Sequence, residues 1–469
     1  MENHVDVAII GAGSAGLSAV HQVRRKTDNY LLIDGGELGT TCARVGCMPS
    51  KVLIQVAEDF QRRKMLEREG INNGDKLSVD FEEAMEHVQD LRDAFVDMVF
   101  GSMEPVEEAR KLIESYATFK SDNELEVDGE IIKADKVIIA TGSTPIVPAA
   151  WKNFGDRVIT TDEFFELENL PESIAVIGLG VIGLELGQSL CRLGVNVTGI
   201  DQQEIISEIK DPVINKVAID TIGKEMTMWL GHAADISEGT NNKLKVSAGD
   251  NSTEVDMVLL SMGRTPNLAS LGLENTSLEL DARGIPVFNP HTSQCGDSTI
   301  FIAGDVNGTR PILHEAGHEG KIAGVNAAAD TITAYKRKTP MAITFSEPNI
   351  CTCGASFDEL DEANTVIGEM RMGPVGRALI MGKNKGHIRI YAEQGSGKLL
   401  GASICASKGE SLIHMLTLAI ERGETVQSML AMPFYHPVME EAVQAALYDL
   451  YSKLNIEKAG PVELIPLEE

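Results

Sequence analysis

The chain carries one short pattern twice. VAIIGAGSAG (residues 7–16) and IAVIGLGVIG (174–183) are apolar runs that enter G-x-G-x-x-G, and each is followed by a helix-like segment. Each also reaches an acidic residue, Asp34 or Asp201, at the same spacing. A single G-x-G-x-x-G is often only a turn, but a strand, a helix and an acid around it predict a dinucleotide-binding unit. The repeat therefore predicts an α/β fold with two nested Rossmann-like lobes.

The two patterns assign matching roles to their residues. The first glycine makes a tight turn, the second lets the backbone approach a pyrophosphate, and the third allows close packing of helix and strand. Two such sites predict two dinucleotides, and the pairing that makes chemical sense is FAD with a nicotinamide cofactor. The predicted contacts are Gly11, Gly13, Ser14, Ala15, Gly16 and Asp34 in the first lobe, and Gly178, Gly180, Val181, Ile182, Gly183 and Asp201 in the second.

The acid of the second pattern favours NAD over NADP. A carboxylate at Asp201 would accept hydrogen bonds from the adenosine ribose and would repel a 2′-phosphate. The segment that follows, QQEIISEIK, supplies no arginine that could bind that phosphate. A second pair of similar segments, ADKVIIATGSTP (134–145) and VDMVLLSMGRTP (255–266), marks the end of each predicted nucleotide-binding lobe.

Two of the seven cysteines, Cys42 and Cys47, are separated by only four residues. The N-terminus shows no signal-peptide pattern, which predicts a cytoplasmic protein, where a close cysteine pair is more often metal-binding or redox-active than structural. The other cysteines offer no C-x-x-C partner for zinc, so the sequence predicts a redox pair and no metal. They are Cys191, Cys295, Cys351, Cys353 and Cys405.

The local sequence also bears on the geometry of the pair. An ideal helix would separate the two Cα atoms by about 7.5 Å, beyond the roughly 6.8 Å limit of disulfides, so a bridge requires a distorted turn. Gly46 makes that distortion easier, and Met48 with Pro49 is expected to discourage a regular helix just beyond. A strained disulfide is more readily reduced, as a working redox centre requires.

The net charge of the chain limits the classes of partner that it can bind. With 41 Lys and Arg against 70 Asp and Glu, the net charge of -29 argues against nucleic acid and anionic membrane surfaces. No apolar run is long enough to span a bilayer.

Taken together, these features resemble the class I pyridine nucleotide–disulfide oxidoreductases, which contain FAD, over essentially the whole chain. In that family the C-x4-C pair is followed by a Pro and a Lys, which match Pro49 and Lys51. The resemblance implies that Cys42 exchanges with substrate and that Cys47 lies against the flavin. It also implies that Lys51 pairs with Glu185 beside the flavin N5.

The resemblance extends to later segments. STIFIAGDV (298–306) is similar to the second FAD motif, which implies that Asp305 binds the ribityl chain, although Cys295 stands where the family usually has Thr. The remaining cofactor contacts that it implies are Thr41, Ala117, Thr141, Gly142, Ser143, Leu313, His314, Gly263 and Arg264.

FYHPVMEEAVQAAL (434–447) is similar to the family's His-Pro segment. The resemblance implies that His436 is the acid/base and that Glu441 orients it, with Glu440 as a competitor for that role. In the family this His reaches the disulfide of the other subunit, which implies a homodimer. A His held by a carboxylate is also the group that a dithiol needs to lose its protons near neutral pH.

Within the family, GLGVIGLELG looks most like dihydrolipoamide dehydrogenase. This implies oxidation of a dihydrolipoyl dithiol, free or on a lipoyl domain of a 2-oxoacid dehydrogenase complex, with NAD as acceptor. The alternatives are an NAD(P)H-dependent reductase of another small disulfide or quinone, and a non-catalytic flavoprotein scaffold. The chain is long enough for three domains. The expected ranges are 1–148 and 273–339 for the FAD domain, 149–272 for the NAD domain, and 340–469 for an α+β dimerisation domain.

Other conspicuous residues receive plainer interpretations. Cys351 and Cys353 share one face of a predicted strand and, with Cys295, are expected in the core. His314 and His318 are expected on a helix beside the flavin rather than at a metal. The charged stretch 64–98 is expected to be a solvated helical excursion from the first lobe.

Overall fold

The computed structural model describes residues 4–458, 460–465 and 467, and it confirms the predicted α/β class. The first lobe begins with β1 (His4–Ile10), α1 (Ser14–Val23), β2 (Tyr30–Ile33), α2 (Thr41–Arg44), α3 (Cys47–Gln61), α4 (Arg63–Leu66), η1 (Glu67–Glu69), η2 (Gly74–Lys76) and α5 (Phe81–Glu108). It continues with β3 (Leu112–Ile113), β4 (Ala117–Ser121), β5 (Glu124–Val127), β6 (Glu130–Ile139) and β7 (Ser143–Pro145). The chain returns to it through η4 (Leu273–Asn275), β17 (Ile300–Ile302), η5 (Asp305–Asn307) and α9 (Leu313–Ala327).

The second lobe is inserted between these two parts. Its elements are η3 (Ala149–Arg157), β8 (Val158–Ile159), α6 (Thr161–Phe164), β9 (Ser173–Ile177), α7 (Val181–Leu193), β10 (Asn196–Asp201), α8 (Pro212–Ile222), β11 (Thr227–Leu230), β12 (Ala234–Glu238), β13 (Leu244–Ala248), β14 (Asn251–Val255), β15 (Met257–Leu260) and β16 (Arg264–Pro266).

The two lobes repeat one sheet design. The first sheet has the order β3-β2-β1-β6-β5-β4, with β17 parallel to β6, and the second has the order β11-β10-β9-β15-β8. In the first, Ala8 lies beside Leu31, and in the second Ala175 lies beside Thr198. In both lobes the two paired residues are the same number of positions apart in the sequence, so the register of the two βαβ units is identical. The predicted duplication is therefore present in three dimensions.

The C-terminal domain is an antiparallel sheet covered by helices. Its elements are β18 (Met341–Thr344), β19 (Asn349–Gly354), η6 (Phe357–Glu359), β20 (Thr365–Arg371), α10 (Gly376–Met381), β21 (Gly386–Glu393), β22 (Leu399–Ala406), α11 (Gly409–Arg422), α12 (Val426–Leu430) and α13 (Glu441–Lys453). The strand order is β18-β19-β22-β21-β20. Cys351 and Cys353 are buried between this sheet and its helices, as predicted.

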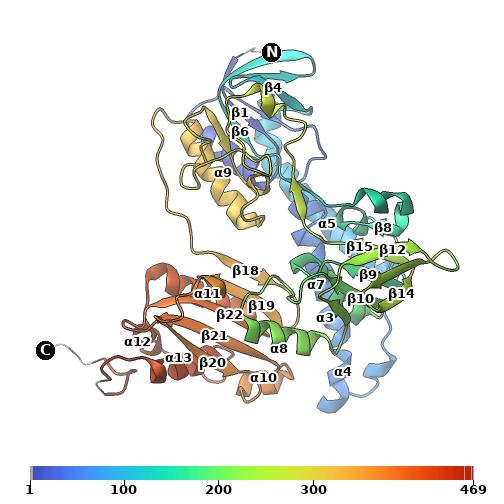
Figure 1. The fold of residues 1–469 in the computed structure, drawn as a ribbon, viewed down its shortest axis with the longest axis vertical. Helices are drawn as coiled ribbons and strands as arrows, with labels where there is room; N and C mark the ends of the chain where they lie inside the picture. Colours follow the sequence, from blue (N-terminus) through green and yellow to red (C-terminus); the bar gives the residue numbers. More distant parts are fainter. Residues whose placement is uncertain (1–3, 459, 466, 468–469) are drawn as a thin grey trace.

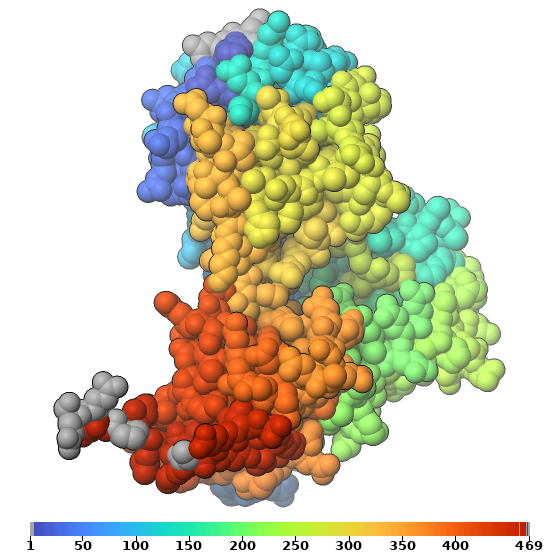
Figure 2. Space-filling view, turned by 60° about the vertical axis from the view of Figure 1, so that its left-hand side comes forward, coloured from blue at the N-terminus to red at the C-terminus, as the bar shows by residue number. Residues whose placement is uncertain are grey.

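The domains are arranged with α3 at their centre. Figure 1 shows the first lobe at the top, the second at the right and the C-terminal domain below, and α3 packs against α7 and α5. The connection 328–340 leaves the end of α9 and descends to β18, and Figure 2 shows it running over the surface. The helix that begins at Cys47 thus contacts an element of the other dinucleotide lobe.

One expectation about this region is confirmed only in part. Residues 64–98 are largely helical, but α5 is not simply solvated, because Met85 and Val88 are buried against Leu53 of α3. The many charges of α5 lie on its outer face, and its apolar stripe covers the thiol-bearing helix.

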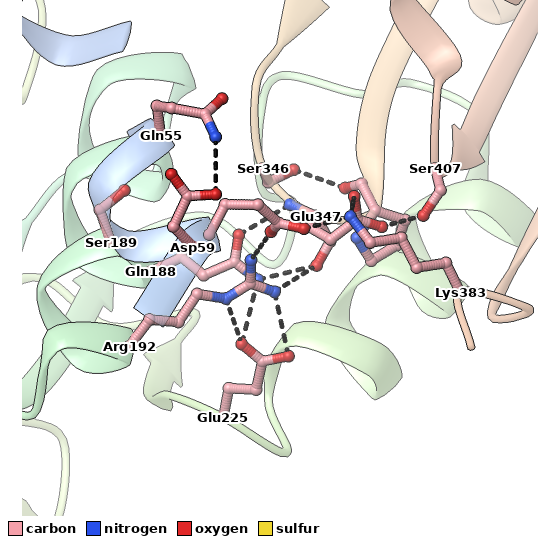
Figure 3. Close-up of polar contacts among 12 residues, drawn as sticks. Gln55, Asp59, Gln188, Ser189, Arg192, Glu225, Ser346, Glu347, Lys383 and Ser407 are labelled. Carbon is pink, nitrogen blue, oxygen red and sulfur yellow. Dashed lines mark hydrogen bonds and ion pairs between the residues drawn. The ribbon is translucent and has the colours of Figure 1, made fainter. Parts of the chain in front are cut away.

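The three domains meet at a cluster of charged side chains, which we call the three-domain cluster: Glu58, Arg192, Glu225, Glu347 and Lys383. Arg192 on α7, only 7% exposed, donates to Glu58 of α3 and to Glu225, both at 2.8 Å. Figure 3 shows its guanidinium between Glu225 and the Glu347 backbone, to whose carbonyl it donates at 3.1 Å. Lys383 pairs with both Glu58 and Glu347.

Replacing Arg192 with Met is expected to lower the free energy of unfolding by about 3 kcal/mol, because Glu58 and Glu225 would lose their guanidinium in half-buried positions. Urea unfolding of the holoenzyme measures the loss. The matched control is Arg157→Met, because Arg157 pairs with an exposed carboxylate, that of Glu238, and its loss is expected to cost less than about 1 kcal/mol. Equal losses in the two variants would contradict the expectation.

Candidate active site

The thiol pair lies at a break between two helices. Cys42 is on α2, Cys47 is the first residue of α3, and Gly46 between them has non-helical angles of φ -130° and ψ -118°. A Cβ atom on Gly46 would lie 2.9 Å from the Thr41 carbonyl oxygen. The sequence predicted this distortion correctly. It was wrong about Pro49, because the helix begins before it, and a proline in the first turn removes an N–H that has no helical partner.

The two thiols differ in acidity. The hydrogen bond between them lowers the pKa of Cys47 to about 7 and raises the pKa of Cys42. Lys51 also favours the Cys47 thiolate, and a position at the N-terminus of a helix acts in the same direction. Cys47 is therefore the better leaving group when a thiolate attacks Cys42, because a thiol of lower pKa leaves faster.

Lys51 and Glu185 form the pair that the family resemblance implied. The Lys51 ammonium lies 2.6 Å from the Glu185 carboxylate, and Glu185 is only 3% exposed. Its other oxygen accepts from the Phe345 backbone N–H at 2.8 Å. Lys51 also lies over the Phe345 ring, 4.7 Å from its centre. The pair thus joins α3 to α7, one helical turn after Cys47.

The glycine loops have the shape that a dinucleotide requires. Gly11 and Gly178 have positive φ angles, 111° and 96°, and Cβ atoms there would lie 2.3 and 2.4 Å from carbonyl oxygens of the neighbouring strand ends. Gly13 and Gly180 have no atom within 3.5 Å of an ideal Cβ, which leaves space in front of the N-termini of α1 and α7. Both loops can therefore receive a pyrophosphate.

The two predicted ribose acids are held identically. Asp34 accepts from the backbone N–H groups of Ala12 and Gly36, and Asp201 accepts from those of Leu179 and Gln203, at 2.5–2.8 Å. Each carboxylate has about four acceptor positions, so both can still accept from ribose hydroxyls. The residues after Asp201 are Gln202, Gln203 and Glu204, and none of them carries positive charge.

Asp305, on η5, lies at the end of a chain of hydrogen bonds that links the two lobes. Ser143 Oγ donates to Asp305 at 2.9 Å, and Arg264 Nε donates to Ser143 Oγ at 2.8 Å. Asn267, which the sequence analysis missed, bonds to Thr141 through its backbone carbonyl and its side chain. The sequence feature that could have indicated Asn267 is its position directly after VDMVLLSMGRTP.

The other predicted contacts are spread around the same loops. Gly142 and Gly263 adjoin β7 and β16, Val181 and Ile182 open α7, Leu313 and His314 open α9, and Thr41 opens α2. Ser14, Ala15 and Gly16 form the first turn of α1, and Gly183 is buried in that of α7. Ala117 is buried at the start of β4.

His436 is held by a carboxylate at the surface of the C-terminal domain. Its Nδ1 lies 2.8 Å from Glu441 Oε1, and the other Glu441 oxygen accepts from the Val438 N–H. The hydrogen bond from His436 lowers the pKa of Glu441. Glu440 instead precedes α13 as its cap residue. The imidazole is 78% exposed and belongs to the segment between α12 and α13. Figure 1 shows these two helices on the side of the domain away from α3, the helix that begins at Cys47.

The remaining expectations concern Cys295, His314 and His318. Cys295 is 1% exposed, as predicted, and burial raises its pKa to about 12. His314 and His318 lie on α9, and no group of His, Cys, Asp or Glu within the described ranges could hold a metal ion. No helix of that part of the chain is long and apolar enough to cross a membrane.

The site combines two loops that can receive dinucleotides with a thiol pair at a helix N-terminus and the Lys51–Glu185 pair one turn further along that helix. This combination defines a disulfide oxidoreductase with two dinucleotide sites. Residues 5–329 match the family described as pyridine nucleotide-disulphide oxidoreductase, and residues 340–447 match its dimerisation domain. The chain belongs to this family, whose cofactors are FAD and NAD(H).

Curated relatives match along almost the whole chain. The dihydrolipoyl dehydrogenase of Bacillus subtilis is 30% identical over 458 residues, which cover 94% of this chain and 97% of the relative. The dihydrolipoyl dehydrogenase of Chlamydia pneumoniae is 29% identical over 450 residues, with coverage of 94% and 96%.

Solved structures share the fold. LpdA from Mycobacterium tuberculosis has a TM-score of 0.82 at 20% identity, and it covers 95% of this chain and 99% of its own. The HOCl-induced flavoprotein disulfide reductase RclA from Escherichia coli, in a Cu(II) complex, has a TM-score of 0.81 at 22% identity, with the same coverage.

Proposed function

We propose that this flavoprotein disulfide oxidoreductase oxidises a dihydrolipoyl dithiol and passes the electrons to NAD. The observation that carries the exchange chemistry is the thiol pair, with Cys47 the more acidic member at the start of α3. The choice of dithiol is supported by the dihydrolipoyl dehydrogenases that match over 94% of this chain. A lipoyl domain of a 2-oxoacid dehydrogenase complex would present the same dithiol.

The proposed reaction starts from the oxidised pair. A substrate thiolate attacks Cys42 Sγ, the Cys42–Cys47 bond breaks, and Cys47 leaves as the thiolate. The second substrate thiol, deprotonated by His436 of a second copy, attacks the substrate sulfur of the mixed disulfide and releases Cys42. The substrate is now a disulfide and the enzyme pair a dithiol, so two electrons have moved. When bound, FAD would supply the acceptor for these electrons and the hydride chemistry that reduces NAD.

The remaining residues are proposed to position the cofactors. The Lys51–Glu185 pair joins the thiol-bearing helix to α7, the helix that follows the second glycine loop, and it would lie beside the flavin. Asp34 and Asp201 would bind the two riboses, and Asp305 the ribityl chain. The corresponding domains are residues 1–148 with 273–339 for FAD, 149–272 for NAD and 340–469 for dimerisation.

Steady-state kinetics test this proposal. We expect kcat/KM for dihydrolipoamide with NAD to exceed that for NADH with glutathione disulfide, cystine or a quinone. With NADP the value should fall about 5- to 150-fold, because the 2′-phosphate would meet Asp201 at a cost of about 1–3 kcal/mol.

Two other results would contradict the proposal. Faster NADH-dependent reduction of a disulfide or quinone would favour a reductase. Uptake of only two electrons per subunit from dithionite would favour a flavoprotein scaffold without a working thiol pair, because flavin and pair together take up four.

A further inference from the structure

The turn that carries Asp305 is held from both sides by a buried carboxylate. Glu319, on α9, is 1% exposed. Its Oε2 accepts from the Gly304 backbone N–H at 2.9 Å, just before Asp305, and from the Asn307 side chain at 2.6 Å, just after it. Asn307 is itself buried. One buried carboxylate oxygen thus bonds to residues on both sides of Asp305.

The Glu319 carboxylate is paired with a cation that comes from outside α9. Arg337 lies on the connection 328–340, and its Nη2 donates to Glu319 Oε1 at 2.7 Å and to Glu315 Oε2 at 2.6 Å. Glu315 is 2% exposed and also meets Arg310 at 3.2 Å. Burial by itself would lower the pKa of Arg337, but the two carboxylates outweigh it and raise the pKa. A buried carboxylate without such a partner is strongly unfavourable.

We propose that Arg337 is a positioning residue for FAD: through Glu319 it holds the Asp305 turn in the conformation that retains the cofactor. The connection to the C-terminal domain thereby contributes to cofactor retention, although it belongs to no dinucleotide motif. The proposal rests on FAD binding by the family and not on the identity of the dithiol, so it can fail or hold independently of the proposed substrate.

The test measures FAD release from the holoenzyme, by the rise in flavin fluorescence after dilution. We expect Arg337→Met to speed release about tenfold or more, because Glu319 would lose its cation and the turn its support. The matched control is Arg389→Met, which also leaves a buried carboxylate, that of Asp211, but far from η5 in sequence and between other elements. It should lower the stability to urea and change the release rate less than about twofold.

Two double variants keep the test decisive if Arg337→Met does not fold. Arg337→Met/Glu319→Gln removes the unpaired charge but keeps an amide oxygen for Gly304 and Asn307, so release should return to within about threefold of wild type. Arg337→Met/Glu315→Gln should still release FAD rapidly. Equal release rates in these double variants, or acceleration by Arg389→Met as large as by Arg337→Met, would overturn the proposal.

Discussion

Replacing Cys42 with Ser is expected to lower dithiol oxidation by at least about 10³-fold, because a serine hydroxyl cannot form the mixed disulfide. The FAD of this variant should still be reduced by NADH, since the glycine loops and the Lys51–Glu185 pair are unchanged. Stopped-flow reduction of the flavin and steady-state turnover with dihydrolipoamide separate the two effects.

The control for this prediction is Cys191→Ser. Cys191 is half-buried and its thiol contacts the Glu225 carbonyl, a bond that serine can keep, so turnover should be unchanged. Undiminished turnover by Cys42→Ser would remove Cys42 from the mechanism.

Loss of His436 is expected to lower turnover about 10²- to 10⁴-fold, the usual contribution of a general acid/base. Because His436 is exposed and its flanking helices α12 and α13 lie away from α3 in Figure 1, we expect it to act on the thiols of a second copy. Homodimers of His436→Ala and of Cys42→Ser should both be nearly inactive. Mixed dimers of the two should regain up to about half of the wild-type activity, because one of their two composite sites is intact.

The neighbouring carboxylates supply a matched pair of controls. Glu441→Gln should lower the rate less than loss of His436, because it disturbs the orientation and tautomer of the imidazole without removing it. Glu440→Gln should have little effect, because Glu440 precedes α13 as its cap and Glu441 makes the contact with His436. Mixed dimers that form but recover no activity would show that base and thiols act within one chain.

The sequence predicted the parts of the fold that depend on local patterns. The two glycine loops need particular residues at fixed spacing, so both βαβ units and their acids could be read directly. The break at Gly46 followed from the geometry of a disulfide. The error at Pro49 arose because the effect of a proline depends on its position in a helix, and the first turn tolerates it.

Apart from Lys51 with Glu185, which the family resemblance implied, contacts between distant charged residues could not be predicted. Glu319, Arg337 and Arg192 look like ordinary surface residues in the sequence, because a charged side chain carries no sign of burial until its partner is known. Their partners come from other elements, and no periodicity connects them. The burial of α5 against α3 was missed for the same reason, since its many charges masked a narrow apolar stripe.

The three-domain cluster bears on how such a chain can be recombined. Each dinucleotide loop is a local motif, which suggests that the second lobe could be exchanged for that of a relative with another coenzyme preference. Arg192 would leave with that lobe, whereas Glu58, Glu347 and Lys383 would stay behind. The chimera would then leave Glu58, on the helix that carries Cys47 and Lys51, and Glu347 to share Lys383 without Arg192. A chimera that preserves redox function must therefore take both sides of the three-domain cluster, together with the nucleotide loop, from the same relative.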